Sequence, residues 1–343
     1  MIIFIIFFLN FILCTDNFNF STNHQSNIST ATYLNDSKIL VNKKNLILSI
    51  IVKYSWDIVL PFIKSLVISN IKNCDIVIFG GNISEPVKNN IKSFGLYFYE
   101  IPEKFMNIDI TLSRWKIYLD FLENKRDKYN LILSIDIRDT ILQTDFFSLY
   151  ENHKPFLGLS LEDDKLNEKR NKEWITNIFG KKVHESIKNN KIINGGIIWG
   201  TFNEIFEFIN LVWIHISKIQ NPIDQSIINY LIYYKKIFNN RVIFSDNFGP
   251  VITLGLTERK NIIINYSKKQ IINFEGQIAS IVHQYDRHQD IAKLIYEKLC
   301  PEYIENMNNK KKILLVFYLL QSLIVCIFLK VLKSWFNIKF SKT

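Results

Sequence analysis

Cysteine is scarce in this chain, with four residues in 343, and that scarcity excludes a small fold held together by disulfides. Glycine and proline are also few, at 11 and 7 residues, while 48% of the chain is hydrophobic. This composition excludes collagen and intrinsic disorder and leaves ample material for a core. Acidic residues number 32 against 42 Lys and Arg, a formal net charge of +10. Because the lysines are scattered rather than gathered in one motif, we do not predict a nucleic-acid partner.

Long apolar runs occur only at the two ends. Residues 1–14 carry no charge and are typical of the apolar part of a secretory signal peptide. They lack a basic start and a clean cleavage site, so an N-terminal anchor is an open alternative. Residues 313–329 are also uncharged and have lysines on both sides. We predict a transmembrane helix over 313–332, followed by a basic tail over 333–343.

Asn-x-Ser sequons lie between these ends, and with the apolar start they favour a body inside the secretory lumen. They are Asn27, Asn35, Asn82 and Asn265. We therefore predict a membrane-anchored protein whose main domain is lumenal, in the Golgi or the endoplasmic reticulum. Cys74 and Cys300 are the pair that could form a disulfide there, and the sequence does not decide whether they do.

The chain between the two ends divides into a polar segment and one domain. Residues 15–44 are rich in Asn, Ser and Thr and have no apolar period, which predicts a flexible stalk. From Leu46 onward short apolar runs alternate with amphipathic stretches, without a linker or an internal repeat. We predict a single domain over 45–305. The alternation indicates an α/β fold with one Rossmann-like, mostly parallel sheet flanked by helices.

Individual elements follow from the apolar pattern. Strands are expected at 45–52, 74–81, 94–101, 129–136, 154–161, 191–200, 241–245 and 277–284. Helices are expected at 57–71, 111–124, 171–180, 202–219, 223–236 and 290–299. In open α/β sheets, ligands bind beyond the carboxyl ends of the strands. The polar residues at those ends are therefore the candidates for a site.

Two carboxylates follow the predicted strand over 129–136, in the run LILSIDIRDT. Asp136 ends this strand and Asp139 comes three residues later, so both can face one point. Their repulsion is costly unless a cation lies between them or one takes a proton. Mg²⁺ and Mn²⁺ prefer such oxygens and leave positions for water and phosphate. Arg138 could hold either carboxylate or reach a phosphate; the alternative is an Asp-rich turn with an ordinary ion pair.

Three later stretches of the sequence also offer polar groups to a site, and the first two are within predicted elements of the middle of the chain. Asn194, Gly195 and Gly196 interrupt an apolar strand, where glycine often marks the close approach of a ligand; the alternative is a β-bulge. Asp224 and Gln225 open a helix, where Asp224 could simply favour the helix dipole.

A late apolar strand ends at His283, which is followed by Gln284, Asp286 and Arg287. A lone histidine at such a position is often structural. A neutral imidazole can also complete a Mn²⁺ site begun by two carboxylates.

This order of features resembles the GT-A glycosyltransferases, in particular the glycogenin-like nucleotide-diphospho-sugar transferases. The resemblance covers residues 45–300 and depends on the ordered set: an acidic strand end, N-G-G, D-Q and a late strand ending in His. It implies a GT-A fold and metal-dependent transfer of a sugar from a nucleotide-diphosphate donor. A UDP-sugar is the family's common donor, and the acceptor would be a hydroxyl of a glycan, protein or lipid.

The resemblance also implies roles for particular residues. The predicted ligands of Mn²⁺ or Mg²⁺ are Asp136, Asp139 and His283. The predicted donor-binding residues are Ile51 and Lys53 at the base and ribose, Asn194, Gly195 and Gly196 at the sugar, and Arg114, Arg138 and Arg287 at the diphosphate or elsewhere on the donor. The candidate catalytic residues are Asp224 and Gln225, near the anomeric carbon, and Glu162 as a second possible base.

One departure from the family pattern is visible. The usual motif is D-x-D, whereas this chain has D-I-R-D, so either Asp139 is the second ligand or Arg138 replaces one acid. The departure keeps open a catalytically inactive lumenal binding protein on the same fold. A further alternative is a phosphohydrolase of the haloacid-dehalogenase kind, whose first motif also places aspartates after an apolar strand.

Overall fold

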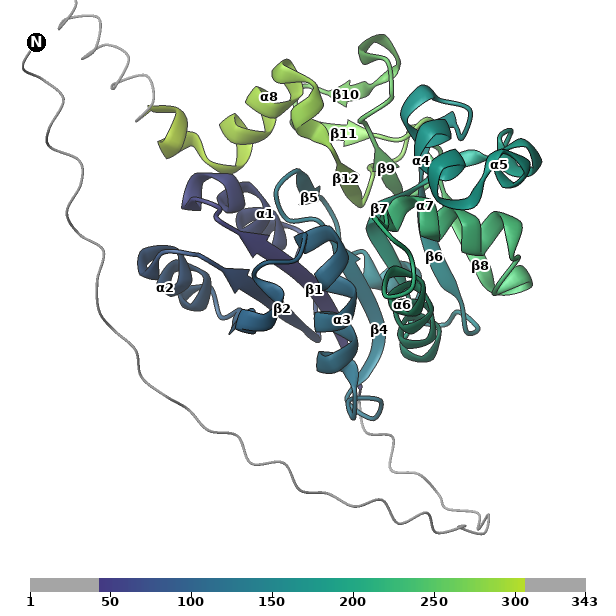
Figure 1. Cartoon of the computed structure of the whole chain (residues 1–343). Helices are drawn as coiled ribbons and strands as arrows, with labels where there is room; N and C mark the ends of the chain where they lie inside the picture. The colour runs from purple at the N-terminus through teal and green to yellow at the C-terminus, as the bar shows by residue number, and fades with distance from the viewer. Residues whose placement is uncertain (1–42, 306–343) are drawn as a thin grey trace, which may run out of the picture. The chain divides into compact units, whose positions relative to one another are not determined.

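The structure is a computed structural model that describes residues 43–305. Figure 1 labels its elements. The strands are β1 (Lys44–Val52), β2 (Cys74–Gly81), β3 (Tyr97–Glu100), β4 (Tyr129–Ile135), β5 (Thr140–Leu142), β6 (Leu157–Lys165), β7 (Lys191–Thr201), β8 (Val242–Ser245), β9 (Val251–Thr253), β10 (Ile263–Asn265), β11 (Gln270–Ile272) and β12 (Ile281–His283). The helices are α1 (Trp56–Ile68), α2 (Glu85–Ser93), α3 (Ile110–Leu122), α4 (Lys169–Phe179), α5 (Lys181–Ile187), α6 (Phe202–Ile216), α7 (Asp224–Asn229) and α8 (Gln289–Leu299).

The largest sheet has seven strands in the order β3-β2-β1-β4-β7-β6-β8. Strands β3, β2, β1 and β4 run parallel to one another, and β6 runs parallel to β8. Strand β7 is antiparallel to both of its neighbours, β4 and β6. The protein is α/β, and four of the six strand pairs in this sheet are parallel. The single Rossmann-like sheet that we expected is wrong, because this sheet is mixed and two smaller sheets accompany it.

The reversed direction of β7 has a simple origin. The last residue of β6, Lys165, pairs with the first residue of β7, Lys191. The intervening chain, which contains α4 and α5, therefore begins and ends at the same edge of the sheet, and the chain returns alongside β6. As a result, the second half of β7 pairs with β4, from Thr201 opposite Leu131 to Ile197 opposite Ile135, and Gly196 lies next to the end of β4.

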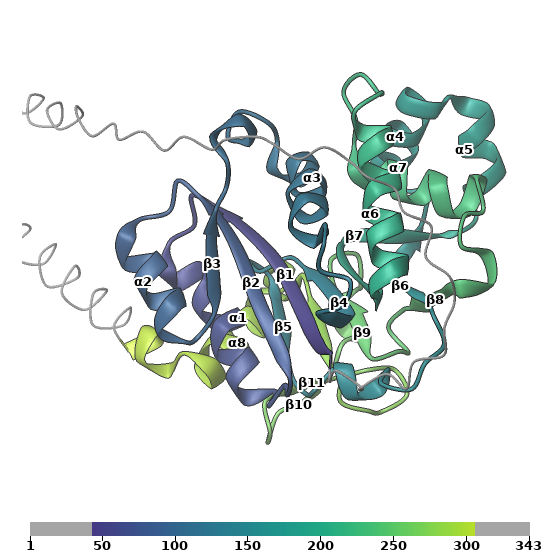
Figure 2. The ribbon, with the colours of Figure 1, turned by 90° about the horizontal axis from the view of Figure 1, so that it is seen from below.

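Side chains of β1 alternate between two cores. Leu46 and Leu48 pack in a cluster with residues of α3 and α6, whereas Ile47 and Ile51 pack in a cluster with residues of α1 and α2. This alternation is expected where successive side chains point to opposite faces of a strand, and both faces are covered here. Figure 2 shows α3 and α6 on one side of the sheet and α1 and α2 on the other.

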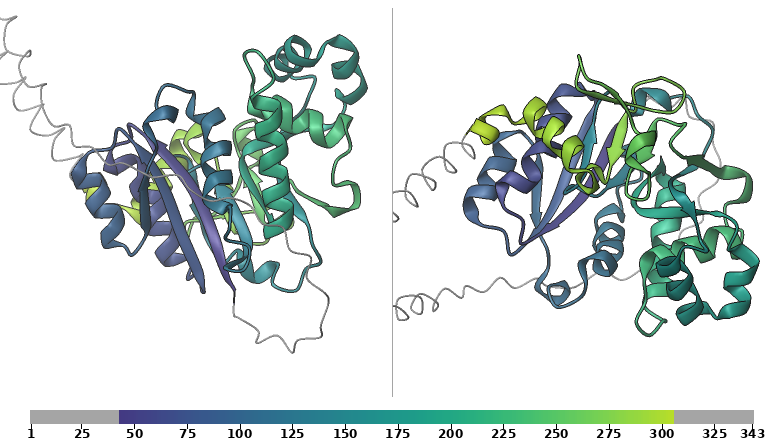
Figure 3. Two further views of the ribbon diagram at one scale, coloured as in Figure 1. Left: turned by 60° about the horizontal axis from the view of Figure 1, so that its bottom comes forward. Right: turned by 90° about the horizontal axis from the view of Figure 1, so that it is seen from above.

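A small three-stranded sheet places β12, from the late part of the chain, next to β5, which follows β4. Its order is β5-β12-β9, with β12 antiparallel to β5 and parallel to β9. Helix α8 continues from β12 and packs near α1, where Tyr296 Oη donates to the Asp57 carbonyl at 3.0 Å. The right view of Figure 3 shows α8 beside α1. A separate hairpin, β10–β11, completes this region.

Several expectations about membrane placement are not supported. Among residues 43–305, no helix combines the length and the hydropathy needed to cross a bilayer. The expected transmembrane helix in the fold class and the membrane-anchored, lumenal location are therefore corrected on this finding. The expected signal peptide or anchor (1–14), most of the stalk (15–44), the segment 313–332 and the basic tail (333–343) lie outside the described residues. Within the described part of the chain, Cys74 and Cys300 are not bonded to each other.

Candidate active site

The acidic turn between β4 and β5 is held at both ends. Strand β4 ends at Ile135, and the backbone N–H of Asp136 donates to the Gly196 carbonyl of β7 at 2.8 Å. Ile137, 1% exposed, is anchored in a core cluster, and Thr140 begins β5. The turn thus directs both carboxylates, three residues apart, to the edge of the sheet.

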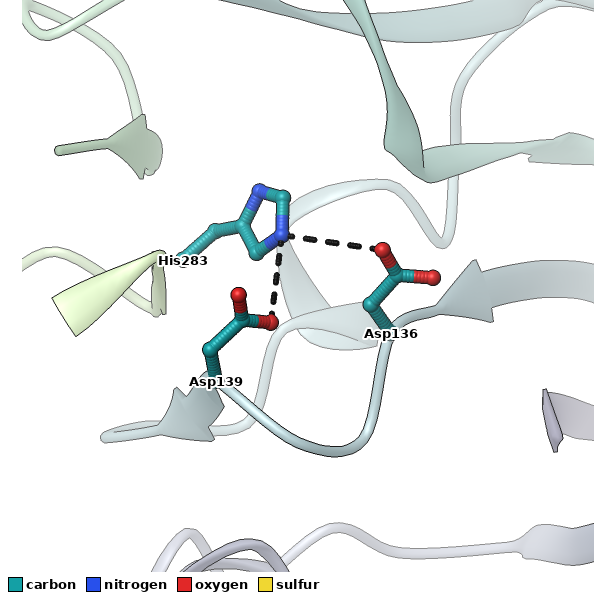
Figure 4. Close-up of side chains that lie close together, drawn as sticks. All are labelled: Asp136, Asp139 and His283. Carbon is teal, nitrogen blue, oxygen red and sulfur yellow. Dashed lines mark ion pairs between the residues drawn. The ribbon is translucent and has the colours of Figure 1, made fainter. Parts of the chain in front are cut away.

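His283 reaches this turn through strand pairing. In the β5–β12 ladder, His283 lies opposite Thr140, the neighbour of Asp139. Its Nε2 is 3.5 Å from Asp139 Oδ1 and 3.9 Å from Asp136 Oδ2, as Figure 4 shows. The imidazole is buried, and neither of its nitrogens has a hydrogen-bond partner among residues 43–305. The structure therefore brings together the three residues that we predicted as metal ligands.

Each carboxylate of this triad also has an arginine. Arg114 Nη1 donates to Asp136 Oδ1 at 2.8 Å, and Arg138 Nη2 donates to Asp139 Oδ2 at 2.8 Å. The other oxygen of each carboxylate is the one nearest His283. One oxygen of each acid is consequently engaged by a guanidinium, and the second remains turned toward the imidazole.

The electrostatics of the triad favour a shared positive charge. Burial opposes ionisation of Asp139, but His283 and Arg138 outweigh it and hold the pKa of Asp139 well below its ordinary value. Burial alone would lower the pKa of His283, but Asp139 and Asp136 outweigh it and raise that pKa. The raised pKa of His283 reflects the negative charge next to the ring, which a proton on the imidazole or a cation can compensate.

The triad fits a divalent cation. One ligand atom from each of the three residues can be chosen so that all lie within 4.8 Å of one another. Ligands on opposite sides of Mg²⁺ are about 4.2 Å apart, since each bond is about 2.1 Å. The three ligand atoms would therefore have to move only slightly closer together to bind the ion. The buried nitrogens of His283, which have no hydrogen-bond partner among the described residues, are a second observation that fits a bound cation. The Asp136 side chain is 40% exposed, which leaves a route for the ion.

Gly196 is required by this geometry. A Cβ at Gly196 would lie 2.6 Å from Asp136 Oδ2 and 2.7 Å from His283 Cε1, too close for either contact. At Gly195 the same addition meets its nearest atoms at 3.4 Å, an ordinary contact. The second glycine of N-G-G therefore marks the close approach of site side chains, and the predicted approach of a donor remains a prediction.

Arg114 connects the acidic turn to the start of α7. Its Nη2 donates to the Gly195 carbonyl at 2.8 Å and to Asp224 Oδ2 at 2.7 Å. Asp224 Oδ2 also accepts from Trp115 Nε1 at 3.3 Å, and Asp224 Oδ1 accepts from the backbone N–H of Gln225 at 2.7 Å. Both oxygens of Asp224 are therefore engaged, which suits a residue that positions others better than a free base.

A second polar group lies on β6 and β7. Asn194 Nδ2 donates to Glu162 Oε1 at 2.7 Å, and Asn194 Oδ1 accepts from the Gly196 N–H at 2.7 Å. Burial raises the pKa of Glu162, although Asn194 and the charge of His283 partly oppose that rise. Glu162 is 3% exposed and thus a buried acid that holds its proton more readily than an ordinary glutamate.

Gln225 is tied to this group from α7. Its Oε1 accepts from the Gly195 N–H at 3.4 Å, and its Nε2 donates to Asn171 Oδ1 at 3.1 Å. Asn171 and Trp115 are the members of the network that the sequence analysis missed. Asn171 lies in the first turn of α4, and a polar residue at a helix start is the signal that could have identified it. Trp115 directly follows Arg114 in the sequence.

The remaining predicted donor-binding residues lie outside these contacts. The side chain of Ile51 is buried in a core cluster, so only its backbone could face a ligand. Lys53 is exposed after β1, with a φ of 59°, and its N–H donates to the Gly81 carbonyl. Arg287 is half-exposed in a 3-10 turn and pairs with Asp286 at 3.8 Å.

No protein-family model and no curated protein sequence matches the chain. Among solved structures, an active-site mutant of LgtC matches with a TM-score of 0.46 and 13% identity, over 73% of this chain and 94% of its own. The galactosyltransferase LgtC in complex with donor and acceptor sugar analogs gives a TM-score of 0.46 and 13% identity, over 73% and 95%. The bifunctional glycosyltransferase WbbM gives 0.49 and 14%, over 75% of this chain and 50% of its own.

At such low identity and with TM-scores below 0.5, the likenesses carry no weight for the reaction itself. What the chain does has to be argued from its own residues.

Proposed function

We propose that this protein is a metal-dependent glycosyltransferase that moves a sugar from a nucleotide-diphosphate donor, a UDP-sugar, to a hydroxyl of a glycan, protein or lipid. The observation that carries the proposal is the convergence of Asp136, Asp139 and His283, with an arginine on each carboxylate. Carboxylates alone would repel a diphosphate. Two carboxylates and an imidazole around Mn²⁺ or Mg²⁺, flanked by guanidinium groups, form an arrangement that attracts one.

The cation, once bound by these three side chains, would supply positive charge for the departing diphosphate. The protein's own contribution is to present one free oxygen from each carboxylate while Arg114 and Arg138 hold the other. His283 offers a buried nitrogen with no competing hydrogen bond. The three candidate ligands are thus close together before the cation arrives, and such preorganisation is the main source of electrostatic catalysis.

The polar group on β6, β7 and α7 is suited to the sugar. Asn194 and Gln225 offer amides, and Glu162 offers a carboxyl group whose pKa burial raises. A carboxylate with a raised pKa is a better proton acceptor for an attacking hydroxyl, so Glu162 is the preferred candidate base. Asp224, with both oxygens engaged, acts in this proposal by holding Arg114 and Gln225 in place.

The test is a screen for hydrolysis and transfer across sugar nucleotides, with and without Mn²⁺. We expect turnover with at least one UDP-sugar, loss of turnover on chelation, and loss of both turnover and Mn²⁺ binding in Asp136→Asn and Asp139→Asn. Asp163→Asn, which removes a partly exposed carboxylate next to Glu162, is the matched control and should retain Mn²⁺ binding. Full turnover in both site variants would refute the metal assignment.

A catalytically inactive binding protein is the second candidate, and the Arg138–Asp139 ion pair is the observation that favours it. A guanidinium on the candidate metal ligand Asp139 would leave the site able to bind a nucleotide and unable to promote its cleavage. Calorimetry with UDP and Mn²⁺, combined with the screen, separates the two candidates. Nucleotide binding without any hydrolysis or transfer would favour this second one.

A further inference from the structure

The two arginines of the site differ in how firmly they are held. The Arg114 side chain is 8% exposed and is fixed by Asp136, Asp224 and the Gly195 carbonyl. The Arg138 side chain is 40% exposed, and its partners are Asp139 at 2.8 Å and Asp286 at 3.6 Å. Arg114 is therefore a permanent part of the site, whereas Arg138 can leave Asp139 by rotation of an exposed side chain.

Arg138 also competes with a metal for the same carboxylate. Its guanidinium lies on Asp139 Oδ2, and Asp139 Oδ1 faces His283, so the positive group and the cation site share one acid. A unit positive charge at this distance weakens the attraction of Asp139 for a divalent ion. A nucleoside diphosphate offers Arg138 a second, stronger partner, because guanidinium binds phosphate oxygens through paired hydrogen bonds.

We propose that Arg138 couples metal binding to donor binding. Without a nucleotide it neutralises Asp139 and keeps the affinity for Mn²⁺ low. When a nucleoside diphosphate binds, Arg138 turns to the phosphates and releases Asp139 to the metal. By linkage, the diphosphate must raise the affinity for Mn²⁺ by the same factor as Mn²⁺ raises the affinity for the diphosphate. This inference rests on the proposed function and assigns a regulatory role to the residue that departs from D-x-D.

The sign of one measurement separates this role from a structural one. If Arg138 only held Asp139 in position, then Arg138→Met would weaken Mn²⁺ binding. If Arg138 competes with the metal, the same change strengthens Mn²⁺ binding in the absence of nucleotide, by about tenfold for the removal of one adjacent charge. The side chain is half-exposed, so the variant should fold, and a thermal unfolding curve checks this.

The experiment measures Mn²⁺ affinity by electron paramagnetic resonance, with and without UDP, on the full chain. We expect Arg138→Met to bind Mn²⁺ more tightly than wild type without UDP, and UDP to improve that affinity far less than in wild type. Arg138→Lys, which keeps the charge, should stay close to wild type without UDP. Arg259→Met removes an equal charge from a surface pair with Asp290 and should change neither value.

The outcomes distinguish this inference from the proposed function. A wild-type chain that binds neither Mn²⁺ nor UDP overturns both. A wild-type chain that binds both, while Arg138→Met binds Mn²⁺ no more tightly than wild type without UDP or gains as much affinity from UDP as wild type does, overturns the coupling role alone and leaves the glycosyltransferase proposal standing.

Discussion

Arg114 and Asp224 are 110 residues apart in the chain and meet at 2.7 Å, Nη2 to Oδ2, in the interior of the protein. The contact joins α3 to the start of α7, and the same guanidinium reaches Asp136 at the end of β4. One buried cation therefore holds together two acids that the sequence presents as separate motifs. Its removal would leave both carboxylates without their arginine partner.

Arg114→Met is expected to lower the free energy of unfolding by about 3–5 kcal/mol, the usual cost of breaking a buried ion pair from one side. Urea unfolding measures this change in the free energy of unfolding. Arg259→Met, at an exposed pair, is the control and should cost about 1 kcal/mol or less. Equal losses in the two variants would contradict the assignment of Arg114 as the central link.

Gly196→Ala and Gly195→Ala form a matched pair one residue apart. The new methyl at Gly196 would overlap Asp136 and His283, whereas the one at Gly195 finds ordinary contacts. We expect Gly196→Ala to weaken Mn²⁺ binding by about tenfold or more, since a displaced ligand costs at least 1.4 kcal/mol of binding free energy. Gly195→Ala should bind Mn²⁺ nearly as wild type does. Equal metal affinities in the two variants would argue against the triad as the metal site.

Asp75 is predicted to make stability depend on pH. It is buried and accepts from Lys44 at 2.8 Å and Tyr129 at 3.0 Å, and pairs with Lys128 at 2.8 Å. Burial opposes its ionisation, but these partners outweigh burial and lower its pKa. A carboxylate with a lower pKa in the folded state stabilises the fold fully above its unfolded pKa of about 3.9, and this contribution is lost as pH falls through the folded value.

Asp75→Asn should therefore cost about 1–3 kcal/mol of unfolding free energy at pH 7, and progressively less below about pH 4. Urea unfolding of wild type and variant at pH 7, 5 and 3 tests this. A difference between the two proteins that stayed constant down to pH 3 would show that the charge of Asp75 is not what stabilises this end of β2.

Glu162→Gln tests the candidate base. If Glu162 accepts the proton of the acceptor hydroxyl, the substitution should reduce turnover by about 100-fold or more with little change in UDP affinity. Because burial raises the pKa of Glu162, the acidic limb of the wild-type pH–rate profile should lie above about 4.3, the ordinary glutamate value. Asp163→Asn, at the residue that follows Glu162, is the control for turnover. Glu162→Gln with wild-type turnover would eliminate the base role.

The local elements were largely accessible to prediction because their signals are local. The apolar runs at 45–52 and 129–136 correspond to β1 and β4, and the acidic turn follows β4 as expected. Long helices such as α3 and α6 were also found from their apolar spacing. Helices α2 and α5 and strands β5, β9, β10 and β11 were missed, because three-residue strands and short polar helices leave too little periodicity to detect.

The arrangement of the site was much less accessible. The direction of β7 depends on its pairing with β6, and no pattern within β7 indicates which way it runs. The contacts of Arg114 with Asp136 and Asp224 depend on two helices and a strand packing together. Sequence reasoning could name Arg114 as a neighbour of the site but could not show that it is buried there.

By itself, the sequence determined which residue types stand at or within the strands: two acids after β4, the adjacent Gly195 and Gly196 within β7 and an imidazole at the end of β12. Only the tertiary structure decided that these groups meet, because their meeting depends on a register, His283 opposite Thr140, between two strands of three residues each. That register is set by packing across the whole domain. A pattern along the chain carries no information about it.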